Sequence, residues 1–161
     1  MSYTNADGLF VLTNGAQGAA LHTGITEEGV QFFVKDIADL TAVGSSFGAS
    51  NINVNDAVIP AGSVILGATL VMTTAATSGG SATLTIGTYN AAGTAIDADG
   101  IDAAIALTAI DADGDVVRCD GAQAAGVAGY LSADAHVGLI YGTAAFTAGA
   151  AKLIISYKKV V

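Results

Sequence analysis

The hexapeptide A-I-D-A-D-G occurs twice in the chain, at residues 95–100 and again at residues 109–114. Calcium is bound in proteins by about six to eight oxygen ligands, and repeated Asp-x-Asp spacing supplies carboxylate oxygens. The two copies and the residues around them hold half of the chain's 14 acids: Asp97, Asp99, Asp102, Asp111, Asp113, Asp115 and Asp120. This segment is therefore the first place to look for a metal site.

The spacing inside the acidic segment does not match a calcium loop. An EF-hand loop needs Asp-x-Asp-x-Asp-Gly and a later glutamate, whereas Gly114 comes too early and no glutamate follows Glu28. The glycine-rich nonapeptide repeats of calcium β-helices are also absent. Asp-Gly is typical of turns, and aspartate near a helix N-terminus interacts favourably with the helix dipole. We therefore predict two acidic turns that flank a short helix and assign no metal ligand; calcium binding by the segment is the weaker alternative.

A serine motif is the second candidate for chemistry, because residues 44–48 read G-S-S-F-G and match G-x-S-x-G. In an α/β-hydrolase the serine of this motif lies between a strand and a helix. Here the following residues, A-S-N-I-N-V-N, alternate as a strand would. We predict a polar loop without catalytic function.

Histidine, cysteine and glutamate are too sparse to form a reactive group. A zinc site needs three or four ligands, and the chain has only His22 and His136. Cys119 is the single cysteine, so no intramolecular disulfide can form, and its position between Arg118 and Asp120 on a short predicted strand indicates a buried rather than a reactive thiol. Glu27 and Glu28 are adjacent and are expected to be solvated. We assign no catalytic or cofactor-binding residue and expect no enzyme and no cofactor.

Alternation of apolar and polar residues with a period of two is the dominant pattern of the chain. Residues 62–74 are apolar on both strand faces in places and predict a long central strand, and T-S-G-G at residues 77–80 predicts a hairpin loop. Further strands are predicted at residues 30–35, 51–55, 82–89, 116–119, 137–141 and 153–157.

One short helix is expected, because Ile101, Ala104, Ile105 and Thr108 fall at helical spacing after a cap at Asp99 or Gly100. Many short strands with little helix predict an all-β fold. We expect an antiparallel β-sandwich or a jelly-roll-like domain at residues 29–161. Residues 1–28 lack sustained alternation and are expected to form an N-terminal arm, or the first strand and loop of the same domain.

The net charge of −9, with only five lysines and arginines, makes nucleic-acid binding improbable, because phosphates must be neutralised by cations. The longest apolar run, residues 64–72, is broken by Gly67 and Thr69 and is shorter than the ~20 residues of a membrane span. We expect no membrane partner. The N-terminus shows no signal-peptide pattern, which predicts a soluble chain synthesised in the cytoplasm.

Four segments carry a resemblance to a known class of proteins: I-P-A-G-S-V-I-L-G-A-T-L-V-M-T-T at residues 59–74, S-G-G-S-A-T-L-T-I-G-T-Y-N at 78–90, G-I-D-A-A-I-A-L-T-A-I-D-A-D-G-D-V-V at 100–117 and T-A-A-F-T-A-G-A-A-K-L-I-I-S-Y at 143–157. In sequence and in order, these segments resemble those of small virion structural proteins of tailed bacteriophages, particularly marine ones, including proteins that decorate or cement capsids. The resemblance spans residues 59–157 and leaves the first 50 residues unplaced.

The resemblance implies a β-sandwich or jelly-roll-like module that assembles on an icosahedral shell, as a homotrimer. It implies a non-enzymatic virion protein on the outer capsid surface that decorates and stabilises the capsid, with the major capsid protein and its own copies as partners. A tail or head-fibre subunit is the first alternative. A calcium-dependent or carbohydrate-binding β-sandwich module is the second.

Overall fold

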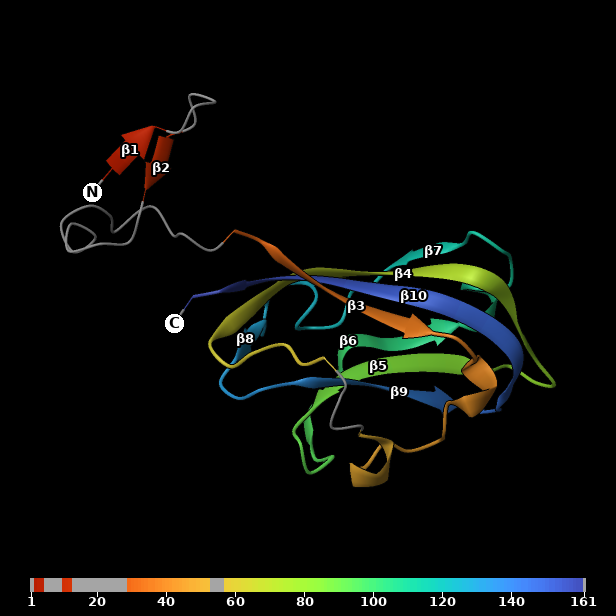
Figure 1. Cartoon of the computed structure of the whole chain (residues 1–161). Helices are drawn as coiled ribbons and strands as arrows, with labels where there is room; N and C mark the ends of the chain where they lie inside the picture. The colour runs from red at the N-terminus through yellow and green to blue at the C-terminus, as the bar shows by residue number, and fades with distance from the viewer. Residues whose placement is uncertain (1, 5–9, 13–28, 53–56, 161) are drawn as a thin grey trace.

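Two stacked β-sheets form the body of the molecule in the computed structural model, which describes residues 2–4, 10–12, 29–52 and 57–160 (Figure 1). The larger sheet has the strand order β3–β10–β4–β7, and β8 also pairs with β4. Its strands are β3 (Gln31–Ile37), β10 (Phe146–Lys159), β4 (Ser63–Ser78), β7 (Val116–Arg118) and β8 (Tyr130–Leu131).

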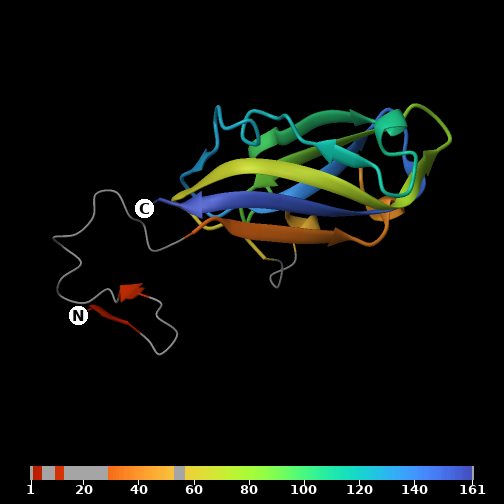
Figure 2. The ribbon, with the colours of Figure 1, turned by 90° about the horizontal axis from the view of Figure 1, so that it is seen from above.

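The smaller sheet has the order β6–β5–β9. Its strands are β6 (Ala95–Ala106), β5 (Thr83–Tyr89) and β9 (His136–Gly142). All pairings between these strands are antiparallel. The predicted class, an all-β antiparallel sandwich or jelly-roll-like domain, is confirmed. Figure 2 shows the larger sheet from above, with β10 and β4 between β3 and β7.

The core lies between the two sheets and is made by the inward residues of each alternating strand. Both layers contribute large aliphatic side chains with no exposed surface, among them Ile65, Leu70, Leu153 and Ile155 from the larger sheet and Leu84, Ile86 and Ile101 from the smaller one. Each such side chain contributes roughly 1.5–3 kcal/mol through its removal from water. The long strands β4 and β10 supply the centre of this core, and β4 is the long central strand that was predicted at residues 62–74.

Two short strands, β1 (Ser2–Thr4) and β2 (Phe10–Leu12), pair with each other in antiparallel register. They form a sheet separate from the two layers. The rest of residues 1–28 lies outside the described part of the chain, so the N-terminal arm stays a prediction.

The helix expected at residues 101–108 is wrong. Residues up to Ala106 belong to strand β6, and only Leu107–Ala109 form a single 3₁₀ turn, η4. Ile101 and Ile105 are buried because β6 pairs with β5, with Ile105 opposite Leu84. A separation of four residues places side chains on one face of a helix and also on one face of a strand. The spacing of Ile101 and Ile105 therefore fits a helix and a strand equally, and the pairing of β6 with β5 makes this segment a strand.

The short helices of the described residues are 3₁₀ turns, because η2 (Leu40–Ala42) and η3 (Ala49–Asn51) join η4 in this class. The strand expected at residues 51–55 lies mostly outside the described residues, and its first residue ends η3. No helix in the described ranges has the length and apolar content needed to cross a bilayer.

The hairpin expected at residues 77–80 is also wrong. Thr77 and Ser78 end β4, and Gly79 and Gly80 lead from it towards β5, but the two strands belong to different sheets. The T-S-G-G segment is thus a crossover from one layer of the sandwich to the other. Turn-forming residues predict that the chain changes direction. Whether the two flanking strands pair with each other depends on which sheet the second strand joins.

Candidate functional site

The two copies of A-I-D-A-D-G adopt different structures. Residues 95–100 are part of strand β6, whereas residues 109–114 run from the end of η4 through a turn. In the first copy Asp97 lies opposite Thr88 of β5. The predicted acidic turn is therefore present at the second copy and absent at the first, and strand β6 and the 3₁₀ turn η4 take the place of the helix between them.

Backbone amides occupy the carboxylates of the acidic turn. Oδ1 of Asp113 accepts a 2.6 Å hydrogen bond from the amide of Ala75, and Oδ2 of Asp115 accepts a 2.9 Å bond from the amide of Ala112. The first bond ties the turn to β4 and the second closes the turn itself. Within the described residues, no three histidine, cysteine, aspartate or glutamate side chains come together as a metal site would require.

The remaining acids of the cluster lie on and beside β6. Burial raises the pKa of the Asp97 carboxyl, and its hydrogen bond to Asp99 raises it further. Asp102 is 6% exposed; burial raises its pKa, and the negative charge of Asp120 adds to the effect. Backbone amides of Ala103, Ala104 and Asp120 bond to the Asp102 carboxylate and partly offset this increase. Hydrogen bonds and partial burial therefore hold Asp97 and Asp102 in place as part of the fold around β6.

The serine motif forms a loop, as predicted. Gly44 makes an isolated bridge to Ile140 of β9, and Ser45 and Ser46 are exposed. The ring of Phe47 packs against that of Tyr89, with 4.3 Å between their centroids. The motif therefore anchors a loop to the smaller sheet through an aromatic pair. The residues after it form the 3₁₀ turn η3, where a strand was expected.

Of the histidine, cysteine and glutamate candidates, His136 and Cys119 lie in the described part of the chain. His136 lies on β9 opposite Tyr89, and its Nδ1 is buried without a hydrogen-bond partner in the described part of the chain. Cys119 is buried, as predicted, and burial raises the pKa of its thiol to about 12. His22, Glu27 and Glu28 lie outside the described residues.

An exposed apolar surface is the feature that sequence reasoning missed. On the outer face of the larger sheet, Phe32 is 66% exposed, Val34 is 52% exposed and Leu66 is 49% exposed. Phe32 and Phe33 are both apolar, so the alternation in β3 did not indicate which of them faces the core; the structure buries Phe33. Contiguous exposed apolar surface marks interaction sites more often than single exposed residues do.

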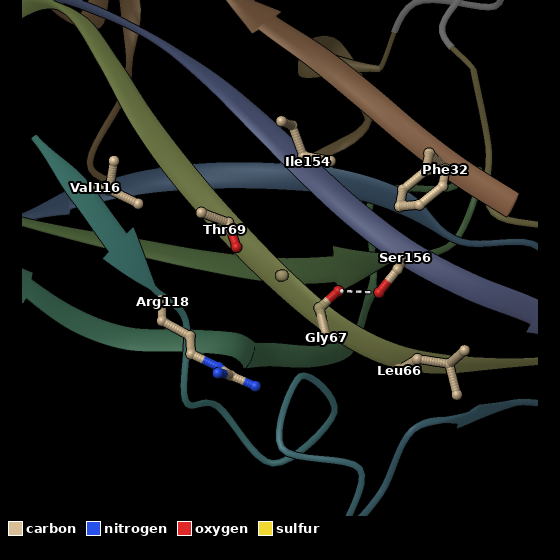
Figure 3. Close-up of a pocket in the computed structure, with 9 residues that line it drawn as sticks. Phe32, Leu66, Gly67, Thr69, Val116, Arg118, Ile154 and Ser156 are labelled. Atoms are coloured by element: carbon tan, nitrogen blue, oxygen red, sulfur yellow. Dashed lines mark hydrogen bonds between the residues drawn. The ribbon is translucent and has the colours of Figure 1, made fainter. Parts of the chain in front are cut away.

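The same face contains a hollow of about 390 Å³, shown in Figure 3. The hollow forms because the side chains of one cross-strand row become smaller from β3 to β4. Phe32 on β3 lies opposite Ser156 on β10, and Ser156 lies opposite Gly67 on β4. The Ser156 hydroxyl donates a 3.2 Å hydrogen bond to the Gly67 carbonyl, so this side chain lies flat. Val116 and Arg118 of β7 line the far side of the hollow.

Charges are segregated between the two sides of the sandwich. The lysines Lys35, Lys152, Lys158 and Lys159 lie on β3 and β10, where Asp36 is the one acid. These strands therefore carry a formal charge of +3, four lysines less one aspartate. Residues 95–120 carry seven aspartates and Arg118, a formal charge of −6. Lys152 and Asp36 form a 3.0 Å ion pair on the outer face of the larger sheet.

Comparison with known proteins yields one structural similarity. No protein-family model and no curated protein matches the sequence. The fold is similar to that of a chain in the solved structure of the capsid of Ralstonia phage GP4, with a TM-score of 0.52 and 19% sequence identity. The similarity covers 88% of this chain and 90% of that chain, so it extends over nearly the whole of both folds.

Proposed function

We propose that the chain is a non-enzymatic virion structural protein of a tailed bacteriophage. In this proposal it decorates and stabilises the icosahedral capsid from its outer surface. Its partners are the major capsid protein and its own copies, which assemble as a homotrimer.

The fold similarity to a phage capsid chain carries the proposal, because it covers about nine-tenths of both chains. If the two chains shared only a small motif, most of each chain would lie outside the matched region. The sequence resemblance of residues 59–157 points to the same class of proteins. Fold alone does not define function, so the surface must also suit assembly.

The surface of the larger sheet supports an assembly role. It presents Phe32, Val34 and Leu66 to solvent, and no three histidine, cysteine, aspartate or glutamate side chains of the described residues come together as a metal site. Apolar side chains around an arginine are typical of the buried centres of protein interfaces. A protein present in many copies also gains strength from repeated contacts that are individually weak.

Purified virions of the phage that encodes the chain provide the test. Mass spectrometry should find the chain in many copies, and cryo-electron microscopy should place it on the outer capsid surface. Particles that lack the gene should still assemble but should release their DNA at a lower temperature. Purified protein added to these particles should restore the original release temperature.

Two results would contradict the proposal. Density for the chain at the tail or on fibres, with capsids of unchanged thermal stability, would favour the tail or head-fibre alternative. Complete absence from virions, together with binding of calcium or of a glycan array, would favour a calcium-dependent or carbohydrate-binding module.

A further inference from the structure

The outer face of the larger sheet is apolar across four of its strands. Five large apolar side chains on this face are each between 49% and 66% exposed: Phe32 and Val34 on β3, Leu66 on β4, Val116 on β7 and Tyr130 on β8. Several exposed apolar side chains on one face mark an interaction site more strongly than the same residues scattered singly. This face is therefore the first candidate for a docking surface.

The hollow of about 390 Å³ gives the face a shape that a partner side chain can enter. Figure 3 shows Phe32 and Leu66 at one end of the hollow and Val116 and Arg118 at the other. Between them lies Ser156, which is small and whose hydroxyl is already bonded to the backbone of β4. The apolar walls of the hollow favour an apolar side chain of the partner.

Arg118 places a positive charge at the rim of the hollow. Its side chain lines the hollow, its residue is exposed, and the described residues give its guanidinium neither an ion pair nor a hydrogen bond. Arginine binds a carboxylate through two parallel N–H donors, and such pairs are among the strongest hydrogen bonds in proteins. An arginine beside exposed apolar side chains therefore favours a partner that carries a carboxylate.

Acidic side chains avoid the larger sheet. Its five strands contain one acid, Asp36, and the 3.0 Å ion pair with Lys152 cancels that charge. Lys158 lies on the same face as Arg118, because it pairs with Val64 in the row that continues to Tyr130. Arg118 and Lys158 therefore leave the face with a formal charge of +2, although the whole chain carries −9.

This combination of charge and apolar surface selects among partners. Two copies that met through this face would place Arg118 and Lys158 of one copy against those of the other, and like charges disfavour that contact. A nucleic acid requires many cations for its phosphates, whereas this face offers two among exposed apolar side chains. The complementary partner is a protein segment with a large apolar side chain and a nearby carboxylate.

We propose that the outer face of the larger sheet is the face that binds the capsid, and that it holds an acidic, apolar segment of the major capsid protein. The apolar side chain of that segment enters the hollow beside Phe32 and Leu66, and its carboxylate pairs with Arg118. This inference rests on the proposed function and adds to it the surface and the chemistry of the contact.

Binding of purified protein to particles that lack the gene tests the apolar part of the contact. Sedimentation of the particles over a range of protein concentrations measures the apparent Kd. Phe32→Ser should raise this Kd at least about tenfold, the effect expected for a central aromatic anchor. Ile96→Ser is the matched control, because Ile96 is an exposed apolar residue on β6 of the smaller sheet, and it should leave the Kd unchanged.

The same measurement tests the charged part of the contact. Arg118→Gln should also raise the Kd at least about tenfold, because it leaves the carboxylate of the partner without its cation. Lys159→Gln changes the net charge by the same amount and should have little effect. Salt screens charge pairs, so the Kd of the wild-type chain should rise with ionic strength more steeply than that of Arg118→Gln. Thermal melts check that all four variants are folded.

Photo-cross-linking identifies the partner directly. Val34→p-benzoyl-phenylalanine places a light-activated group on the face beside the hollow, where Val34 is 52% exposed. On the particles this group should link the chain to the major capsid protein. The linked peptide should contain a large apolar residue near an aspartate or a glutamate.

Two results would overturn this inference alone: wild-type binding that Phe32→Ser and Arg118→Gln both retain, or cross-links that join only copies of this chain. The second result would make another copy the occupant of the face. A wild-type chain that does not bind the particles would remove the proposed function, and this inference with it.

Discussion

The Thr88 hydroxyl donates a 2.9 Å hydrogen bond to Oε1 of Gln123, and both side chains are buried. Thr88 lies on β5 of the smaller sheet, whereas Gln123 lies in the loop that connects β7 to β8. The same loop is held at β6, because the carbonyl of Gly100 accepts a 2.8 Å hydrogen bond from the Gln123 amide. A loop between two strands of one sheet is thus fastened to the other sheet.

Replacing Thr88 by valine should destabilise the protein. The substitution keeps the shape of the side chain but leaves Oε1 of Gln123 buried without its donor, which costs about 1–3 kcal/mol. Urea denaturation measures this as a lower free energy of unfolding. Thr108→Val, at an exposed position, is the control. Equal losses in the two variants would show that the buried bond contributes nothing specific.

Cys119 should be inert in the folded protein. Thiol reagents attack the thiolate, and burial raises the pKa of this thiol to about 12, so little thiolate forms near neutral pH. Ellman's reagent at pH 8 should label the folded chain slowly, at the rate at which local or global unfolding exposes Cys119. In urea the same reagent should label one thiol per chain at once. Immediate stoichiometric labelling without urea would contradict the buried position.

Asp102 should give the stability a pH dependence of known sign. Its pKa is raised in the folded state, so the folded chain holds this proton to a higher pH than the unfolded chain does. The contribution of the group to the free energy of unfolding therefore falls as pH rises from about 4 through the raised pKa. Asp102→Asn removes this titration and should flatten the profile. Urea titrations of both proteins between pH 4 and 7 measure the difference, and parallel profiles would contradict the assignment.

Calcium should leave the melting temperature unchanged. The carboxylates of Asp113 and Asp115 in the second copy of A-I-D-A-D-G already accept backbone hydrogen bonds. A binding ion would have to displace these bonds. Thermal melts with millimolar calcium and with a chelator test this directly. A melting temperature several degrees higher with calcium would return the acidic segment to consideration as a metal site.

The strands with strict alternation could be predicted from sequence, and β5 is an example. Leu84 and Ile86 are apolar between polar neighbours, and the structure buries both. The fold class followed from many such strands. The helix was wrong because Ile101 and Ile105 fit both periods, and only the pairing of β6 with β5 distinguishes them.

The exposed apolar face of the larger sheet could not be found by the same reasoning. Where apolar residues follow one another, as Phe32 and Phe33 do, alternation does not indicate which side chain faces inward. The hollow depends on the cross-strand alignment of Phe32, Ser156 and Gly67, which lie far apart in sequence. Register between distant strands is a tertiary property. The chemistry of acidic residues is visible in the sequence, whereas the exposure of an apolar face depends on tertiary structure.

The repeated hexapeptide has a consequence for anyone who mutates this protein. One copy is an extended segment whose Asp97 faces Thr88 across a ladder, and the other bends so that Asp113 can reach β4. The same substitution at equivalent letters would therefore disturb a strand in one place and a turn in the other. The two copies are identical in sequence but not in structure, because each copy takes its conformation from the residues that surround it.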